Sequence, residues 1–137
     1  GVHLNENALE VDYNEVFMDN EYPDVIDYLS LDIDTSNIDW LRIFPLKSYR
    51  FRVITIEHDA YLYGDKYREP QRKILQDNGY ELVCSNVYVE QSGYEGKECP
   101  FEDWWIDPNQ FELEQLNFIR ENISCENELP SNIISKF

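Results

Sequence analysis

The sequence predicts an α/β protein with a Rossmann-like, doubly wound sheet that an antiparallel pair of strands closes. An apolar run over 25–33 contains acidic residues near its end and precedes a helix-like stretch, which is how open α/β sheets build their binding sites. A second apolar run, over 50–58, repeats this design. Two more strand-like runs, 80–90 and 101–106, are joined by a connection containing Gly93 and Gly96, which favours antiparallel pairing.

The composition is that of one soluble domain. The chain has 137 residues, of which 42% are hydrophobic and 15% aromatic, and no run is long enough to span a membrane. A formal net charge of -17 argues against nucleic acid or an anionic membrane as a partner, because such binding needs clustered Lys and Arg. Cys84, Cys99 and Cys125 lack metal-site spacing, so we expect reduced thiols and a cytoplasmic location.

The first half of the chain predicts a helix followed by a βαβ unit. Asp12 and Glu15 have the spacing of a capping box, which predicts a helix over 12–19. Before Asp32 near its end, the run over 25–33 is apolar apart from Asp27 and Ser30, so we expect a central parallel strand covered by helices on both faces. The next helix is capped by Ser36 or Asn37 and stopped by Pro45, and the strand over 50–58 follows it.

The second half predicts a helix, two strands and a final helix. Pro70 is expected in the first turn of the helix and Gly79 at its C-terminal cap. After the strands over 80–90 and 101–106, Asp107 and Pro108 open the last helix. We therefore expect a single domain over 1–126, followed by a tail over 127–137.

Acidic side chains and a histidine are expected around one crevice, where two neighbouring strands end: Asp32, Asp34, Glu57, His58 and Asp59. Because side chains alternate along a strand, Asp32 and Asp34 should point the same way. Together they could hold a divalent cation, share a proton, or accept hydrogen bonds from a ligand. The alternative is that Asp34 only caps the helix and Asp32 ties down a loop.

Glu57 and His58 are the candidates for proton transfer. Glu57 follows a dry strand, where the pKa of a carboxyl group can be shifted. His58 is one of two histidines, and its ordinary pKa suits a general base, although a lone histidine is more often structural.

A second group of candidates could contact a substrate. Arg68 and Arg72 are four residues apart and would share a helix face, either as a clamp for an anionic group or as neutralising partners for nearby carboxylates. Trp104 and Trp105 should face opposite sides of a strand, so one of them, Trp104, could line a ligand pocket, although packing is the default role for both.

The segment from Asp27 to about Asp107 resembles the C-terminal half of FkbM-type S-adenosylmethionine-dependent methyltransferases. The resemblance is carried by the runs 26–34, 51–59 and 78–83. The family's strand ends in a pattern close to Asp-x-Glu-Gly-x-Glu. Here Asp32 matches, whereas Asp34 stands for Glu, Thr35 for Gly and Asn37 for the second Glu.

The resemblance implies the C-terminal portion of a class I methyltransferase sheet, namely its fourth to seventh strands. It implies methyl transfer from S-adenosylmethionine to a hydroxyl group of a small molecule or glycan. Asp32, which would also contact the cofactor, and Asp34 would border the transfer site, with His58 or Glu57 as base. From the residue patterns themselves, we expect Asp59, Arg68, Arg72 and Trp104 near the substrate. The family's glycine-rich cofactor loop lies upstream of these motifs, so we expect this chain alone to bind S-adenosylmethionine weakly or not at all.

Two other interpretations remain open. Asp32-Ile33-Asp34 is also the DxD pattern that holds a divalent metal against the diphosphate of a nucleotide sugar in glycosyltransferases. Alternatively, the chain is a non-catalytic interaction module. An uncovered sheet edge would then favour homodimerisation.

Overall fold

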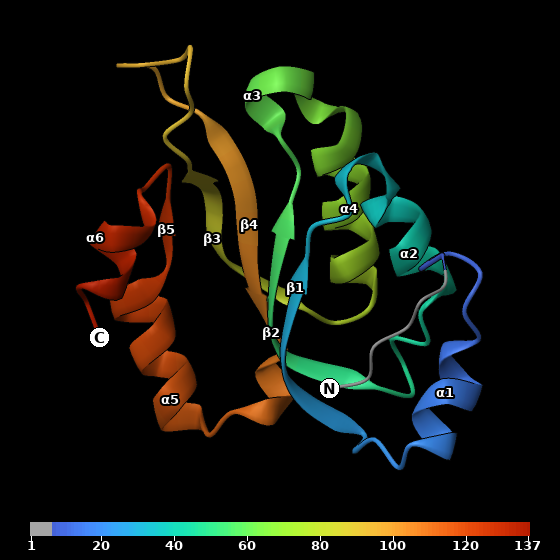
Figure 1. The fold of residues 1–137 in the computed structure, drawn as a ribbon. Helices are drawn as coiled ribbons and strands as arrows, with labels where there is room; N and C mark the ends of the chain where they lie inside the picture. The colour runs from blue at the N-terminus through green and yellow to red at the C-terminus, as the bar shows by residue number, and fades with distance from the viewer. Residues whose placement is uncertain (1–6) are drawn as a thin grey trace.

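The computed structural model describes residues 7–137, so the first six residues of the expected domain lie outside it. Five strands form one mixed sheet in the order β1-β2-β4-β3-β5, with helices packed around it (Figure 1). This arrangement confirms the α/β class and is compatible with a Rossmann-like fold. None of the helices within 7–137 is both long and apolar enough to cross a membrane.

The expected βαβ unit is present. Strands β1 (Val25–Leu31) and β2 (Arg50–Glu57) pair in parallel, and helix α2 (Asn37–Ile43) connects them after a short 3-10 turn, η1 (Asp34–Ser36). The register places Leu31 opposite Ile56. The residues that follow these two positions, Asp32 and Glu57, therefore lie beside each other at the carboxyl edge of the sheet.

The expected antiparallel pair is also present, with an unexpected position in the sheet. Strand β3 (Glu81–Tyr88) pairs antiparallel with β4 (Pro100–Ile106), and β4 lies between β3 and β2. A short strand, β5 (Cys125–Glu126), runs parallel to β3 on its other side. The hairpin thus folds back so that its second strand, and not its first, contacts the βαβ unit.

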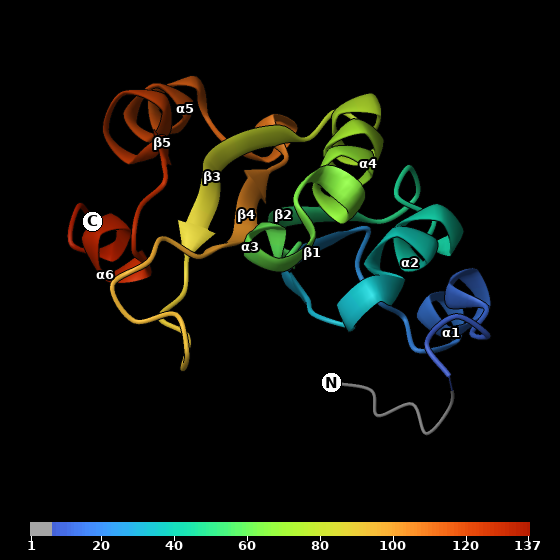
Figure 2. The same ribbon diagram turned by 90° about the horizontal axis from the view of Figure 1, so that it is seen from above.

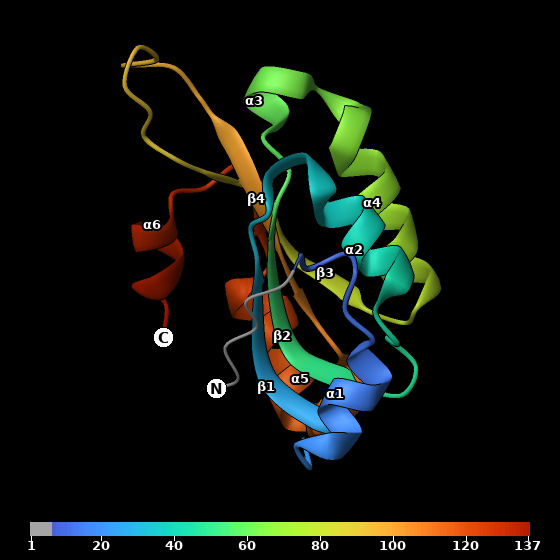
Figure 3. The same ribbon diagram turned by 45° about the vertical axis from the view of Figure 1, so that its right-hand side comes forward.

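Helices α1 (Tyr13–Asp19), α2, α3 (Ala60–Tyr63) and α4 (Asp65–Asp77) lie on one side of the sheet (Figure 3). Under them is the larger core, whose fully or almost fully buried members include Leu41, Ile54, Ile56, Leu75 and Trp105. As expected, Gly79 ends α4 with a positive φ of +81°. Pro70, expected in the first turn, lies inside α4 instead, because the helix begins at Asp65.

A smaller core covers β3 and β4 from the other face, beneath the C-terminal elements (Figure 2). These are a 3-10 turn (Pro108–Gln110), α5 (Leu113–Phe118), a π-helical turn (Ile119–Ile123) and α6 (Pro130–Ile134). Ile133 is 0% exposed within this core. The segment expected as a tail after residue 126 therefore contributes to this core, because Ile133 of α6 belongs to the same buried cluster as Val83 and Val87 of β3.

Strand β1 differs from the expectation of a central strand covered on both faces. It lies at the edge of the described sheet and pairs with β2. Leu29 and Leu31 face the larger core, whereas Tyr28 is 55% exposed. The prediction of a strand covered on both faces was wrong, because the apolar run includes Tyr28, more than half exposed, and Val25, which is 37% exposed.

Candidate functional site

The structure brings three acidic side chains together where β1 and β2 end. One carboxylate oxygen from each of Asp32, Asp34 and Glu57 lies within 4.8 Å of the others. Asp32 and Asp34 are exposed, whereas Glu57 is 8% exposed. The expectation that these neighbouring strand ends build one acidic crevice is therefore met for these residues.

Two of these acidic residues, Asp34 and Glu57, line a pocket of about 260 Å³, whereas Asp32 lies outside the lining set. Helices α3 and α4 provide one wall, and the turns after β1 and β2 provide the other. The residues that line the pocket are Asp34, Thr35, Glu57, His58, Asp59, Tyr63, Tyr67 and Gln71.

The turns after both strands have unusual backbone conformations. Asp34 has φ of +53° and Asp59 has φ of +49°, both in the left-handed region. Asp is one of the few residue types other than glycine that adopt this region readily. Strand β1 ends at Leu31, so Asp34 approaches Asp32 through this turn and not through strand alternation.

Asn37 joins the two strand ends. Its side chain is 1% exposed, with Oδ1 accepting from the main-chain N–H of Ile33 at 3.0 Å and Nδ2 donating to the main-chain oxygen of Glu57 at 2.8 Å. Gln71 donates to the same Glu57 oxygen at 3.1 Å. The sequence predicted a capping role and a motif position for Asn37 but not its contact with Glu57, because that contact spans 20 residues and has no local signal.

The electrostatics of the site centre on Glu57. Burial, followed by hydrogen bonds with Asp59 and Asp32 and the negative charge of both, raises the pKa of Glu57 to about 10. Glu57 is therefore protonated at neutral pH, and its proton is shared with a neighbouring carboxylate. A carboxyl group in this state cannot act as a general base until the proton is removed or displaced.

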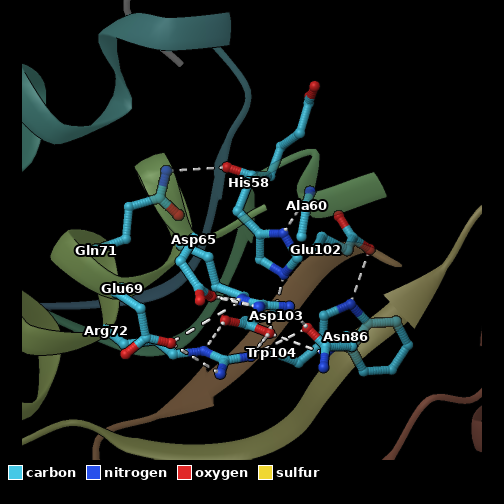
Figure 4. Close-up of polar contacts among 12 residues, drawn as sticks. His58, Ala60, Asp65, Glu69, Gln71, Arg72, Asn86, Glu102, Asp103 and Trp104 are labelled. Carbon is cyan, nitrogen blue, oxygen red and sulfur yellow. Dashed lines mark hydrogen bonds and ion pairs between the residues drawn. The ribbon is translucent and has the colours of Figure 1, made fainter. Parts of the chain in front are cut away.

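His58 is buried next to the pocket, at 2% exposed, and both of its ring nitrogens have partners. Nδ1 accepts from the N–H of Ala60 at 3.1 Å, so the proton of a neutral ring resides on Nε2, which faces Asp103 Oδ1 at 3.2 Å (Figure 4). Neither nitrogen is left to receive a substrate proton. These contacts match the structural alternative for His58.

Asp103, which sequence reasoning missed, anchors this network from β4. It is 1% exposed and accepts hydrogen bonds from His58, from the N–H of Asn86 and from Arg72, whose Nε lies 2.8 Å from Oδ2. Burial alone would raise the pKa of Asp103, but the hydrogen bonds from His58 and Arg72 outweigh it and lower the pKa to about 2. The sequence feature that could have indicated this role is an Asp within an expected strand, next to two tryptophans.

The two arginines expected on one face of a helix do share a face of α4. Arg72 binds Asp103 with two nitrogens, and Arg68 pairs with Asp65 and donates to Oδ1 of Asn86 at 3.1 Å. Neither arginine lines the pocket. Their contacts match the alternative in which they neutralise nearby carboxylates.

The two tryptophans face opposite sides of β4, as expected. Trp105 is 1% exposed in the larger core, whereas Trp104 packs against the smaller core and donates from Nε1 to Glu102 at 2.8 Å. Trp104 is not among the residues that line the acidic pocket. Of the substrate-contact candidates, Asp59 alone borders it.

Comparisons with known proteins leave the family open. No family model, curated protein or solved structure matches the chain.

Proposed function

We propose that this chain carries the acceptor side of an S-adenosylmethionine-dependent methyltransferase that acts on a hydroxyl group of a small molecule or glycan. The observation that carries the proposal is the carboxylate cluster of Asp32, Asp34 and Glu57 at the carboxyl ends of two parallel strands, where Asp34 and Glu57 line a pocket. In open α/β sheets, this edge is where ligands bind.

The chemistry of the cluster suits an acceptor hydroxyl. The cofactor supplies a methyl group on a positively charged sulfur; a new C–O bond forms as the S–C bond breaks, and the hydroxyl proton must leave. Asp32 and Asp34 are exposed acceptors for that proton. Glu57, protonated and buried, would hold their oxygens in place, and the negative cluster would attract the cationic donor.

The topology supports the same proposal. The resemblance assigns β1 and β2 to the fourth and fifth strands of the methyltransferase sheet and the β3–β4 hairpin to the closing pair. The antiparallel pairing of β3 with β4 is compatible with that closing pair. The unpaired edge of β1 in the described sheet lies where the resemblance would set the cofactor-binding strands. Because a similar fold alone does not establish an activity, the proposal of methyl transfer depends on the carboxylate cluster.

The test is transfer of a labelled methyl group from S-adenosylmethionine to a panel of hydroxyl-bearing acceptors, using the full polypeptide that contains this sequence. We expect Asp32→Asn with Asp34→Asn to lower kcat by roughly 100-fold or more, since general-base catalysis contributes about 10²–10⁴-fold. The control, Glu114→Gln, changes an exposed acid on α5 and should leave turnover unchanged. Wild-type turnover by the double variant would refute the assignment.

The cofactor prediction is tested separately by calorimetric titration of this chain with S-adenosylmethionine. We expect weak binding or none, because the family's glycine-rich cofactor loop lies upstream of the motifs in this sequence. Tight one-to-one binding would contradict the assignment of these strands to the acceptor side.

The metal-compatible spacing of Asp32, Asp34 and Glu57 favours a second candidate, a DxD-type glycosyltransferase. In that case, the chain would bind a nucleotide sugar only when Mn²⁺ is present. Equal binding with and without Mn²⁺, or no binding at all, would remove this candidate.

A further inference from the structure

We propose that Cys84 and Cys125 form a redox-sensitive pair, which reaction with a small-molecule disulfide converts into an intrachain bond that clamps β5 onto β3. Both cysteines are free thiols in this structure. The proposal is independent of methyl transfer, because neither cysteine lines the pocket at the ends of β1 and β2.

The two cysteines lie opposite each other on neighbouring strands. Cys84 of β3 and Cys125 of β5 are register partners in a parallel ladder, and the two strands run side by side in Figure 1. Neighbouring strands are about 4.8 Å apart. Cα atoms joined through a disulfide are about 4.4–6.8 Å apart. A bond between the two cysteines therefore requires no large movement of the main chain.

Both side chains belong to the same side of the sheet. Cys84 is 0% exposed in the smaller core, and Cys125 packs against that core. The Cys84 thiol donates to the main-chain oxygen of Ile123 at 3.5 Å, so its sulfur is directed towards the segment that leads into β5. Burial, followed by a hydrogen bond with the Cys125 thiol, raises the pKa of the Cys84 thiol. The two sulfur atoms are therefore neighbours before any oxidation.

The two thiols differ in their access to solvent. Cys125 is partly exposed and lines a surface pocket of about 340 Å³, next to Ser124 and Glu126. Cys84 is fully buried and is not among the residues that line this pocket. A small-molecule disulfide therefore reaches Cys125 first, and Cys84 is the thiol that resolves the mixed disulfide.

The chemistry is two successive thiol–disulfide exchanges. The Cys125 thiolate attacks one sulfur of glutathione disulfide; a new S–S bond forms as the oxidant's S–S bond breaks, and one glutathione leaves and takes up a proton. The Cys84 thiolate then attacks Sγ of Cys125, the mixed S–S bond breaks, and the second glutathione leaves in the same way. The pair loses two electrons and two protons, which the oxidant gains.

The second exchange needs a brief opening of β5. The thiolate is the nucleophile, and burial disfavours this form at Cys84. Strand β5 has only two residues, Cys125–Glu126, and such short peripheral elements open more readily than central strands. Opening admits solvent to Cys84, and reclosure brings its sulfur back to Cys125. The disulfide then holds β5 against β3.

The bond should also stabilise the folded chain. It joins two positions that are far apart in the sequence, and such a cross-link restricts the unfolded chain. We expect the oxidised protein to melt at least about 5 °C above the reduced protein.

The test is to map the bond after incubation of the chain with glutathione disulfide and alkylation of the remaining thiols. Trypsin cleaves after Lys and Arg and so places each cysteine in a peptide of its own: 74–97, 98–120 and 121–136. Mass spectrometry should find 74–97 linked to 121–136, and 98–120 alkylated. Treatment with dithiothreitol should restore all three thiols.

Two variants complete the test. Cys125→Ser, at a partly exposed position, should remove both the link and the rise in melting temperature on oxidation. The matched control, Cys99→Ala, changes the third cysteine and should keep both, with each variant compared in its own oxidised and reduced forms.

Four results would overturn the proposal. These are glutathione that stays on 121–136 without the link, a link that involves 98–120, a link between two copies of the chain, and an oxidised protein that melts at the same temperature as the reduced one.

Discussion

The side-chain amide of Asn37 donates to the main-chain oxygen of Glu57 at 2.8 Å and so ties the turn after β1 to the end of β2. The same side chain accepts from Ile33 N–H. The contact with Glu57 is buried and the contact with Ile33 is partly buried, and this one residue joins the strand ends that carry the acidic cluster. The site therefore depends on a residue that contributes no ligand atom to it.

Replacing Asn37 with Ala should destabilise the protein by about 2–4 kcal/mol, because one buried and one partly buried main-chain group each lose a partner at about 1–3 kcal/mol apiece. Gln71 offsets part of the loss at Glu57. Urea unfolding measures the loss. Asn117→Ala, at an exposed position on α5, is the control and should stay within about 0.5 kcal/mol of wild type. Equal effects of the two changes would contradict the bridging role.

Asp103 should make the fold sensitive to strong acid. Its pKa is lowered to about 2 in the folded protein against 3.8 ordinarily, so its contribution is fully present above pH 3.8 and is lost as the pH falls towards 2. Asp103→Asn should cost about 3–5 kcal/mol at pH 7, since Arg72 loses its buried partner.

Unfolding at pH 7, 4 and 2 checks this prediction, and the variant should lose less stability than wild type between pH 4 and 2. Asp77→Asn breaks only an exposed pair with Lys73 and should cost less than about 1 kcal/mol. A variant as acid-sensitive as wild type would show that another group controls acid unfolding.

Glu57 should have the opposite effect on the pH dependence of stability. Its pKa is raised to about 10 from 4.5, so the stability associated with its protonated form is fully present below pH 4.5 and is lost as the pH rises towards 10. Glu57→Gln keeps the shape and cannot ionise. Measured with EDTA present, its melting temperature should exceed that of wild type at pH 8 by more than at pH 4.5. A constant difference would show that Glu57 titrates normally.

Ile133 tests the packing of the C-terminal segment. Its side chain is 0% exposed, so Ile133→Ala should cost about 2–4 kcal/mol through lost burial and the cavity left behind. Ile134, its neighbour on α6, is 61% exposed, and Ile134→Ala should cost less than about 0.5 kcal/mol. Chemical unfolding compares the two variants directly, and similar costs would mean that α6 does not pack as described.

Local patterns predicted most of the elements. The helix at 12–19, both parallel strands and the hairpin strands lie within a few residues of their expected bounds, because cap residues, apolar runs and turn glycines act over short distances. Strand order was not predictable in this way. Strand β4 enters between β2 and β3 because of contacts between residues about 50 positions apart, which leave no local trace.

In the candidate site too, local sequence predicts some features and only the tertiary structure decides the others. By itself, the sequence determined that acidic residues follow two neighbouring parallel strands, and hence that Asp32, Asp34 and Glu57 meet at one edge. Only the tertiary structure decided the environment of each group. Burial and nearby carboxylates leave Glu57 protonated, while Asp103, reached from β4, engages His58 and Arg72, because solvation and charge depend on neighbours that folding brings from distant parts of the chain.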